Sequence, residues 1–193
     1  MAGALGFSFP VMAIILRARV AGWAKDIEAG MKEQREGFRS YMQAALDEAR
    51  AAADRGEVPV GAVIVSGGNV VARAGNRTRE LADPTAHAEM LVIREACRLL
   101  GSERLGGHDL YVTLEPCPMC AAAISAARIE RLYYGASDPK SGGVAVGARV
   151  FSHPQCHHVP EVYDGIGAGE AEALLKEFFQ GKRSLPTVDK FPP

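Results

Sequence analysis

The chain has 193 residues, of which 48% are hydrophobic and 23% charged, so it can bury a sizeable core in one globular domain. Its formal net charge of −1 at pH 7 excludes polyanion binding through overall charge, and any contact with nucleic acid must use a local basic patch. Four cysteines, two of which fall in a Cys-x-x-Cys pair that suits a metal, do not suggest a disulfide framework, which favours a reducing cytoplasm as the location.

The N-terminus is predicted to be an extension that stands apart from the folded domain. Residues 2–16 carry no charge, but they are fewer than the about 20 apolar residues of a membrane span, and no basic segment precedes them as in a secretory signal. We therefore expect residues 1–36 to be disordered or to reflect an upstream start codon, with a membrane-surface helix as the alternative. The globular domain is expected over residues 37–185, with a short tail over 186–193. The alternative start codons are Met12, Met31 and Met42.

After the extension, the sequence predicts a helix and a β-hairpin. Apolar residues recur every three or four positions over residues 38–54, which is the spacing of an amphipathic helix. A strand is predicted over residues 58–66, and Gly67-Gly68-Asn69 predicts a tight turn. The chain is then expected to return as a second strand over residues 70–75.

The middle of the chain alternates predicted helices and strands. A polar loop, residues 76–85, leads into a predicted helix over residues 86–100. A strand over residues 108–114 precedes an alanine-rich helix over residues 117–127, and another strand is predicted over residues 129–135. This alternation implies parallel strands joined by crossover helices.

The last third of the chain completes the predicted fold. Residues 136–168 are rich in glycine and proline and are expected to contain one short strand. A final amphipathic helix is predicted over residues 170–179. The fold class is therefore α/β, with a mixed sheet of about five strands between two layers of helices. The residues of the last helix expected to face inward are Leu174, Leu175, Phe178 and Phe179.

Two short motifs supply a set of metal ligands. His87 in the first motif, and Cys117 and Cys120 in the second, are of the types that zinc prefers, and Glu89 stands two residues after His87. Catalytic zinc sites take three protein ligands and keep one position for water, whereas structural sites take four protein ligands. The pattern therefore predicts zinc with a bound water, and Glu89 as the carboxylate that takes a proton from this water and returns it to the leaving group.

Both motifs fall at predicted helix starts. His87 and Glu89 are expected in the first turn of one helix, and Cys117 and Cys120 in the first turn of the next. The positive end of the helix dipole favours thiolates there. Two helix N-termini are thus expected to meet at one metal ion.

Two alternatives to a catalytic zinc site remain open. The Cys-x-x-Cys pair could be a redox pair, although this leaves the upstream His-x-Glu unexplained. A closed structural zinc site would take a fourth ligand from Cys97, Cys156 or His157, and Cys97 is expected to be a buried, inert thiol. The His-rich stretch 153–158 has three interpretations of its own: a second metal site, a loop near the active site, or plain surface polarity.

The pattern H-x-E…P-C-x-x-C is typical of zinc-dependent nucleobase deaminases. The chain resembles the cytidine deaminase-like superfamily and, more closely, the bacterial tRNA-specific adenosine deaminases, over roughly residues 38–183. The stretches that carry the resemblance are Glu57–Val63, Asp83–Glu89, Tyr111–Cys120 and Gly135–Lys140, together with Phe178-Phe179.

The resemblance implies a fold, a reaction and partners. The expected fold is the three-layer α/β/α arrangement of this superfamily, with one Zn²⁺ per subunit. The expected reaction is hydrolytic deamination of adenosine to inosine at the wobble position of an arginine tRNA. The expected partners are the tRNA anticodon loop and a second copy of the chain in a homodimer.

The resemblance also implies substrate contacts. Asn76 matches an asparagine whose amide contacts the target nucleotide, and the backbone amide of Ala88 matches another contact in the pocket. Val58 and Pro59 match an apolar wall against which a base packs, and Asp138 matches a contact to the sugar of a neighbouring nucleotide. The structural alternatives are a loop cap for Asn76, strand core for Val58 and Pro59, and a turn residue for Asp138.

The sequence departs from the family pattern in segments expected to touch RNA. Residues 141–147 replace a small-residue run ending in Gly-Ser, His157-His158-Val159 replaces an Asn-His-basic trio, and the basic cluster at Lys182-Arg183 is short. Two other functions therefore stay open. One is deamination of a free nucleobase such as guanine or cytosine, and the other is a non-enzymatic, zinc-stabilised RNA-binding or assembly module.

Overall fold

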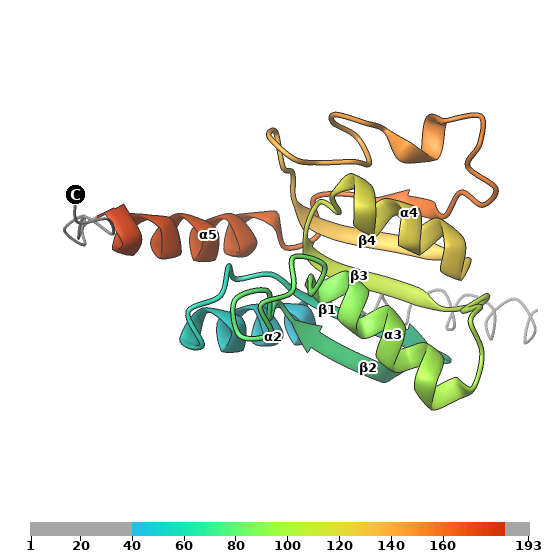
Figure 1. Ribbon diagram of the computed structural model, residues 1–193, viewed down its shortest axis with the longest axis horizontal. Coiled ribbons are helices and arrows are strands. Elements are labelled where there is room, and N and C mark those ends of the chain that lie inside the picture. Colours follow the sequence, from blue (N-terminus) through green and yellow to red (C-terminus); the bar gives the residue numbers. More distant parts are fainter. Residues whose placement is uncertain (1–39, 184–193) are drawn as a thin grey trace, which may run out of the picture. The chain divides into compact units, whose positions relative to one another are not determined.

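The computed structural model describes residues 40–183, so the predicted N-terminal extension and C-terminal tail lie outside the described residues. Its centre is one sheet in the strand order β2-β1-β3-β4-β5 (Figure 1). Strand β1 is antiparallel to both of its neighbours, whereas β3, β4 and β5 run parallel to one another. The strands are β1 (Gly61–Ser66), β2 (Asn69–Gly75), β3 (Asp109–Leu114), β4 (Arg131–Ala136) and β5 (Glu161–Tyr163).

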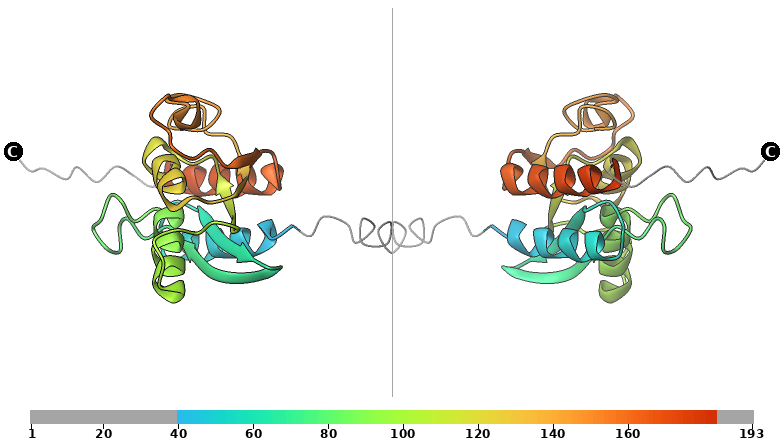
Figure 2. Two further views of the ribbon diagram at one scale, coloured as in Figure 1. Left: turned by 90° about the vertical axis from the view of Figure 1, so that its right-hand side faces the viewer. Right: turned by 90° about the vertical axis from the view of Figure 1, so that its left-hand side faces the viewer.

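Helices cover both faces of this sheet, which confirms the predicted three-layer α/β/α fold. Figure 2 shows α3 and α4 on one face, with α2 and α5 on the other. Helix α3 connects β2 to β3 and helix α4 connects β3 to β4, and each joins strands that run in the same direction, as the alternation predicted. The helices are α2 (Met42–Asp54), α3 (Ala88–Leu100), α4 (Pro118–Ala127) and α5 (Ala168–Arg183), with a short 3₁₀ turn, η1 (Val150–Ser152). None of the helices within residues 40–183 is both long and apolar enough to cross a membrane.

The two layers of helices bury two separate cores. Along β1, Ala62 and Ile64 pack into the core under α3 and α4, whereas Val63 and Val65 pack into the core under α2 and α5. A strand buried on both faces is expected to be continuously apolar, as this one is. Helix α2 lies so close to β1 that a Cβ atom at Gly61 would stand 2.1 Å from the carbonyl oxygen of Ala45 in α2.

Two predicted elements begin later than expected. Helix α2 begins at Met42 because Tyr41, with φ −103° and ψ 11°, is tied to the sheet. Its ring packs edge-on against Tyr111, and its hydroxyl donates to the carbonyl of Gly68 in the hairpin turn. Strand β1 begins at Gly61 and not at residue 58, because Pro59 has no N–H for the ladder.

The last helix is longer than predicted, and fewer of its residues pack against the core than expected. It extends to Arg183, and Leu174 and Leu175 pack against the core as expected. Phe178 is only half-buried, and Phe179 is 42% exposed, so the prediction that both face inward was wrong. The two rings contact each other edge-on, with centroids 5.4 Å apart, and among residues 40–183 no buried core lies beneath this end of α5.

Candidate active site

The three predicted zinc ligands come together from two helix starts. His87 is the N-cap of α3, and Cys117 is the N-cap of α4, while Cys120 lies buried in the first turn of α4. The prediction that His87 and Cys117 lie inside the first turns was therefore wrong. Both have extended backbone, with ψ of 153° and 169°. At Cys117 the reason is local, because Pro118 disfavours helical conformation in the residue before it and favours the first helical position for itself.

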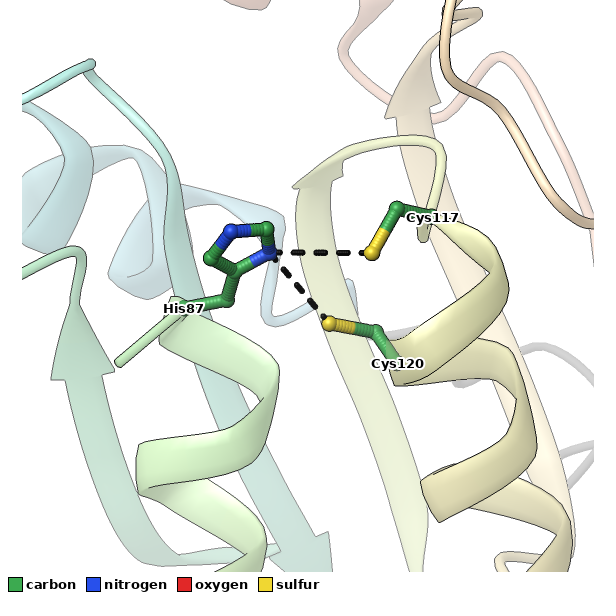
Figure 3. A group of neighbouring side chains, drawn as sticks. All are labelled: His87, Cys117 and Cys120. Atoms are coloured by element: carbon green, nitrogen blue, oxygen red, sulfur yellow. Dashed lines mark hydrogen bonds between the residues drawn. The ribbon is translucent and has the colours of Figure 1, made fainter. Parts of the chain in front are cut away.

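The ligand atoms have the separation that tetrahedral zinc requires (Figure 3). The Nδ1 atom of His87 lies 3.7 Å from the sulfur of Cys117 and 3.5 Å from that of Cys120. Zinc bonds of about 2.3 Å to sulfur and about 2.0 Å to nitrogen, at tetrahedral angles, place such atoms about 3.6 Å apart. The donor set and its spacing therefore fit Zn²⁺ with one open position.

No fourth ligand or second metal cluster emerges in the part of the chain that the structure describes. His87, Cys117 and Cys120 form the one group of three metal-binding side chains within residues 40–183. Cys156 instead lies 3.3 Å from the hydroxyl of Ser125 and donates to the carbonyl of His158. The His-rich stretch thus holds its own loop against α4, which does not support a closed structural site or a second metal site.

The environment of the two cysteines favours a thiolate at Cys117. The hydrogen bond from Cys120 and the neighbouring imidazole of His87 lower the pKa of Cys117 to about 4. Cys120 shares the proton of this pair, so its own pKa is raised by the hydrogen bond to Cys117 and by burial. A bound divalent cation deprotonates coordinating thiols outright. The site is thus prepared to hold a metal.

Glu89 lies beside the metal ligands and is not one of them. It stands in the first turn of α3 and is only 4% exposed. Burial raises its pKa to about 7, against the smaller opposing effects of a backbone hydrogen bond and of His87. A carboxyl group with a pKa near neutrality can both accept and return a proton, which is what a single acid–base group must do.

A cavity of about 230 Å³ opens over Glu89, His87 and Cys117. Such a volume is below the roughly 300–1,000 Å³ of pockets for drug-sized ligands and suits a single ring system. The predicted contact residues Val58, Asn76 and Asp138 line it. Pro59 is buried outside this lining. The lining residues for which the sequence suggested no role are Val60, Thr78, Leu114, Glu115 and Ser141.

Asn76 and Ala88 are joined to each other. The side-chain oxygen of Asn76 accepts the backbone N–H of Ala88 at 2.8 Å, and Asn76 is only 7% exposed. The amide nitrogen of Asn76 remains as the donor for the cavity. The N–H of Ala88 already has this internal partner, which a direct contact with substrate would have to replace.

Two buried carboxylates hold the loops on either side of this cavity, and sequence reasoning missed both roles. Glu57, 1% exposed, accepts hydrogen bonds from the backbone N–H groups of Arg79 and Glu80 and from the hydroxyl of Thr78. Glu115, 2% exposed, holds the loop after β4. The signal in the sequence was a carboxylate flanking a buried strand, where a charge is costly unless it is hydrogen-bonded.

Comparison with known proteins agrees with this geometry. The cytidine and deoxycytidylate deaminase zinc-binding region matches residues 35–136, which contain all three ligands and Glu89. The tRNA-specific adenosine deaminase of Agrobacterium fabrum is 64% identical over 143 residues, which are 74% of this chain and 94% of that protein.

Solved structures separate two kinds of relative. One from a study of A-to-I editing by tRNA:A34 deaminases has a TM-score of 0.69 at 64% identity, covering 70% of this chain and 98% of that one. The guanine deaminase of Bacillus subtilis has a TM-score of 0.52 at 28% identity, covering 81% and 99%. The predicted resemblance is confirmed: the chain belongs to the cytidine and deoxycytidylate deaminase family and, within it, to the tRNA-specific adenosine deaminases, which makes it a zinc enzyme.

Proposed function

We propose that this protein deaminates adenosine to inosine at the wobble position of tRNA, with an arginine tRNA as substrate. The observation that carries the proposal is the buried Glu89, which shares one cavity with His87 and Cys117. The 64% identity to a tRNA-specific adenosine deaminase, against 28% to a guanine deaminase, supports adenosine in RNA as the substrate.

The reaction consumes water and releases ammonia. His87, Cys117 and Cys120 would hold the zinc ion, which when bound would lower the pKa of a water molecule. Glu89 would pass one proton of the attacking water to the ring nitrogen, and would then pass the proton of the newly formed hydroxyl group to the departing amine.

The walls of the cavity orient the base. The free amide nitrogen of Asn76 would donate to the polar edge of the ring, while Ala88 fixes the orientation of this amide. Val58 offers an apolar surface for the base, with Pro59 packed behind it. The carboxylate of Asp138 lines the cavity and also accepts the backbone N–H groups of a turn, so the expected sugar contact and the turn role are compatible.

A single-stranded anticodon loop suits this cavity because a splayed loop base enters without the cost of breaking a duplex. The net charge of −1 implies that binding depends on local contacts around the cavity and not on a general basic field. We place the activity in the cytoplasm, which fits four free thiols.

The protein is also proposed to act as a homodimer. Support comes from the outward side of α4, where exposed Ala122 and Ala126 border a cavity of about 490 Å³ that a second copy could cover. Light scattering on the purified protein should give twice the chain mass of 20.5 kDa. A mass of one chain at micromolar concentration would contradict the dimer.

The proposed reaction is tested with an arginine anticodon stem-loop that carries a wobble adenosine. Zinc-loaded protein should convert this base to inosine, measured by mass spectrometry of the digested RNA. A stem-loop with guanosine at the wobble position is the control. Free adenine, guanine and cytosine are offered in parallel, with ammonia release as the readout.

Each outcome separates the candidate functions. Inosine at the wobble position without ammonia from the free bases supports the tRNA enzyme. Ammonia from a free base with an unchanged stem-loop would overturn the substrate and keep the chemistry of the site. Tight RNA binding without deamination of any substrate would favour the non-enzymatic module.

A further inference from the structure

Glu115 occupies an unusual position for a charged residue. It follows β3 directly, two residues before the zinc ligand Cys117, and its side chain is 2% exposed. It also lines the catalytic cavity. A carboxylate is buried at high cost unless hydrogen bonds replace the lost water, so its partners show what it does.

Within residues 40–183, the hydrogen-bond partners of this carboxylate all belong to one loop. Its Oε1 atom accepts the backbone N–H groups of Val144, Ala145 and Val146 at 3.2, 2.9 and 3.0 Å. Its Oε2 atom accepts the hydroxyl of Ser137 at 3.0 Å and the N–H of Asp138 at 3.1 Å. Glu115 therefore holds both ends of the loop formed by residues 137–146.

The same loop is pressed onto the start of α4. The N–H of Gly143 donates to the carbonyl of Pro116 at 2.8 Å. A Cβ atom at Gly142 would stand 2.6 Å from the Glu115 carboxyl group, and one at Gly143 would stand 2.5 Å from the nitrogen of Pro118. Only glycine permits this approach, so loop, carboxylate and zinc-binding turn form one packed unit. In Figure 1 the orange segment after β4 runs over α4.

The loop carries side chains into the catalytic cavity. Asp138 and Ser141 both line it, and the Oδ1 atom of Asp138 accepts the N–H groups of Lys140 and Ser141 at 3.0 Å each. The hydrogen bond from the N–H of Asp138 to Glu115 fixes the start of this turn. The position of one cavity wall thus depends on Glu115.

We propose that Glu115 is a positioning residue that holds residues 137–146 as a wall of the substrate pocket and thereby sets substrate affinity. Its carboxylate acts through Asp138 and Ser141 and takes no part in proton transfer to the base. This inference rests on the proposed function, because the pocket is taken to receive a nucleotide of RNA. It also explains how a loop of altered sequence, residues 141–147, can keep a defined shape: the three N–H groups that bind Glu115 Oε1 belong to the backbone.

The test compares Glu115→Gln and Glu115→Ala with the wild-type protein, all zinc-loaded, on the wobble-adenosine stem-loop. Glutamine keeps an oxygen that can accept the three N–H groups of residues 144–146, but it loses the oxygen that accepts the N–H of Asp138. Alanine loses both oxygens. We expect KM to rise about tenfold for alanine and less for glutamine, with kcat within about twofold and one zinc per chain. Amide hydrogen exchange should accelerate in peptides covering residues 137–147, and stay unchanged in those covering α3.

Two further variants guard against misfolding and unspecific effects. Gly142→Ala leaves Glu115 intact and pushes a methyl group against its carboxyl group. It should therefore also raise KM and accelerate amide hydrogen exchange in residues 137–147. Glu130→Gln is the matched control, because Glu130 also accepts a backbone N–H, that of Gly107, but lies exposed and outside the cavity lining. It should leave KM and the exchange of the loop unchanged.

The outcomes distinguish this inference from the proposed function. Loss of zinc, or a fall in kcat with unchanged KM, would overturn the positioning role and assign Glu115 to the metal centre or to the chemical step. If wild-type protein fails to convert the stem-loop, the proposed function fails. The exchange measurement needs no RNA and still decides whether Glu115 holds the loop: unchanged exchange in Glu115→Ala would refute it.

Discussion

The side-chain oxygen of Asn76 accepts the backbone N–H of Ala88 at 2.8 Å, which ties the loop after β2 to the first residue of α3. Since His87 precedes Ala88, this bond places the amide of Asn76 directly beside the metal site. The bond uses the side-chain oxygen of Asn76 within the protein and leaves its side-chain nitrogen facing the cavity.

Asn76→Asp should separate these two roles. Aspartate keeps the acceptor for Ala88 but has no N–H to donate, so zinc content and the melting temperature should stay near wild type. We expect kcat/KM for the stem-loop to fall about tenfold to a hundredfold, because the donor to the base is lost. Asn76→Ala should in addition lower the melting temperature, because it leaves the N–H of Ala88 without its partner. An Asn76→Asp protein as active as wild type would contradict the assigned contact.

Glu89→Gln should abolish turnover without removing the metal. Glutamine has nearly the same shape but cannot accept the proton of the attacking water, so kcat should fall about 10²–10⁴-fold or more. Zinc content, measured by plasma mass spectrometry, should remain one per chain. Glu95→Gln is the control on the same helix, since the side chain of Glu95 is 43% exposed and pairs with Arg98. Substantial deamination by Glu89→Gln would refute the role of this carboxylate.

Cys117→Ala should lose zinc and stability together. Removal of one of three ligands leaves the metal poorly held, and a ligand that binds only the folded state raises the melting temperature. Chelation of wild-type protein should therefore lower its melting temperature, and have little effect on Cys117→Ala. Cys97→Ala is the matched control, because Cys97 lies on α3 outside the metal group. Zinc bound at full occupancy in Cys117→Ala would require a different ligand set.

Tyr134 should make the protein sensitive to alkali. Burial is the main cause that raises the pKa of its hydroxyl to about 12, and the negative charges of Glu115 and Asp164 add to this effect. The unfolded chain ionises the same group near its ordinary value of about 10. The stability due to the neutral hydroxyl is thus complete below pH 10 and is lost as the pH rises from 10 to 12.

Denaturant unfolding at pH 8 and at pH 11 measures this effect. The free energy of unfolding should fall between the two values, and it should fall less in Tyr134→Phe. Tyr163→Phe serves as the comparison, because Tyr163 is 43% exposed and its pKa is raised chiefly by its hydrogen bond to Glu161 and not by burial. An equal fall in Tyr134→Phe and wild type would assign the alkaline sensitivity to other groups.

Local patterns in the sequence were sufficient for the elements and for the metal ligands. Periodicity predicted α3 and α4 to within two residues at either end, and the types and spacing of His87, Cys117 and Cys120 predicted the ligand set. The errors lie where a distant contact overrides the local pattern. Tyr41 is held by the hairpin turn and by Tyr111, and no core formed by residues 40–183 lies beneath Phe179.

The sequence by itself determined the chemistry, because ligand types and a neighbouring carboxylate within a few residues define what a metal site can do. Only the tertiary structure decided how the pocket is built. Glu57 lies 22 residues from Arg79, and Glu115 lies 30 residues from Ala145, yet each carboxylate holds a loop at the cavity. No spacing rule spans such separations: the path of the chain through the sheet brings these groups together, and the cost of burying an unpaired charge then requires that they bind.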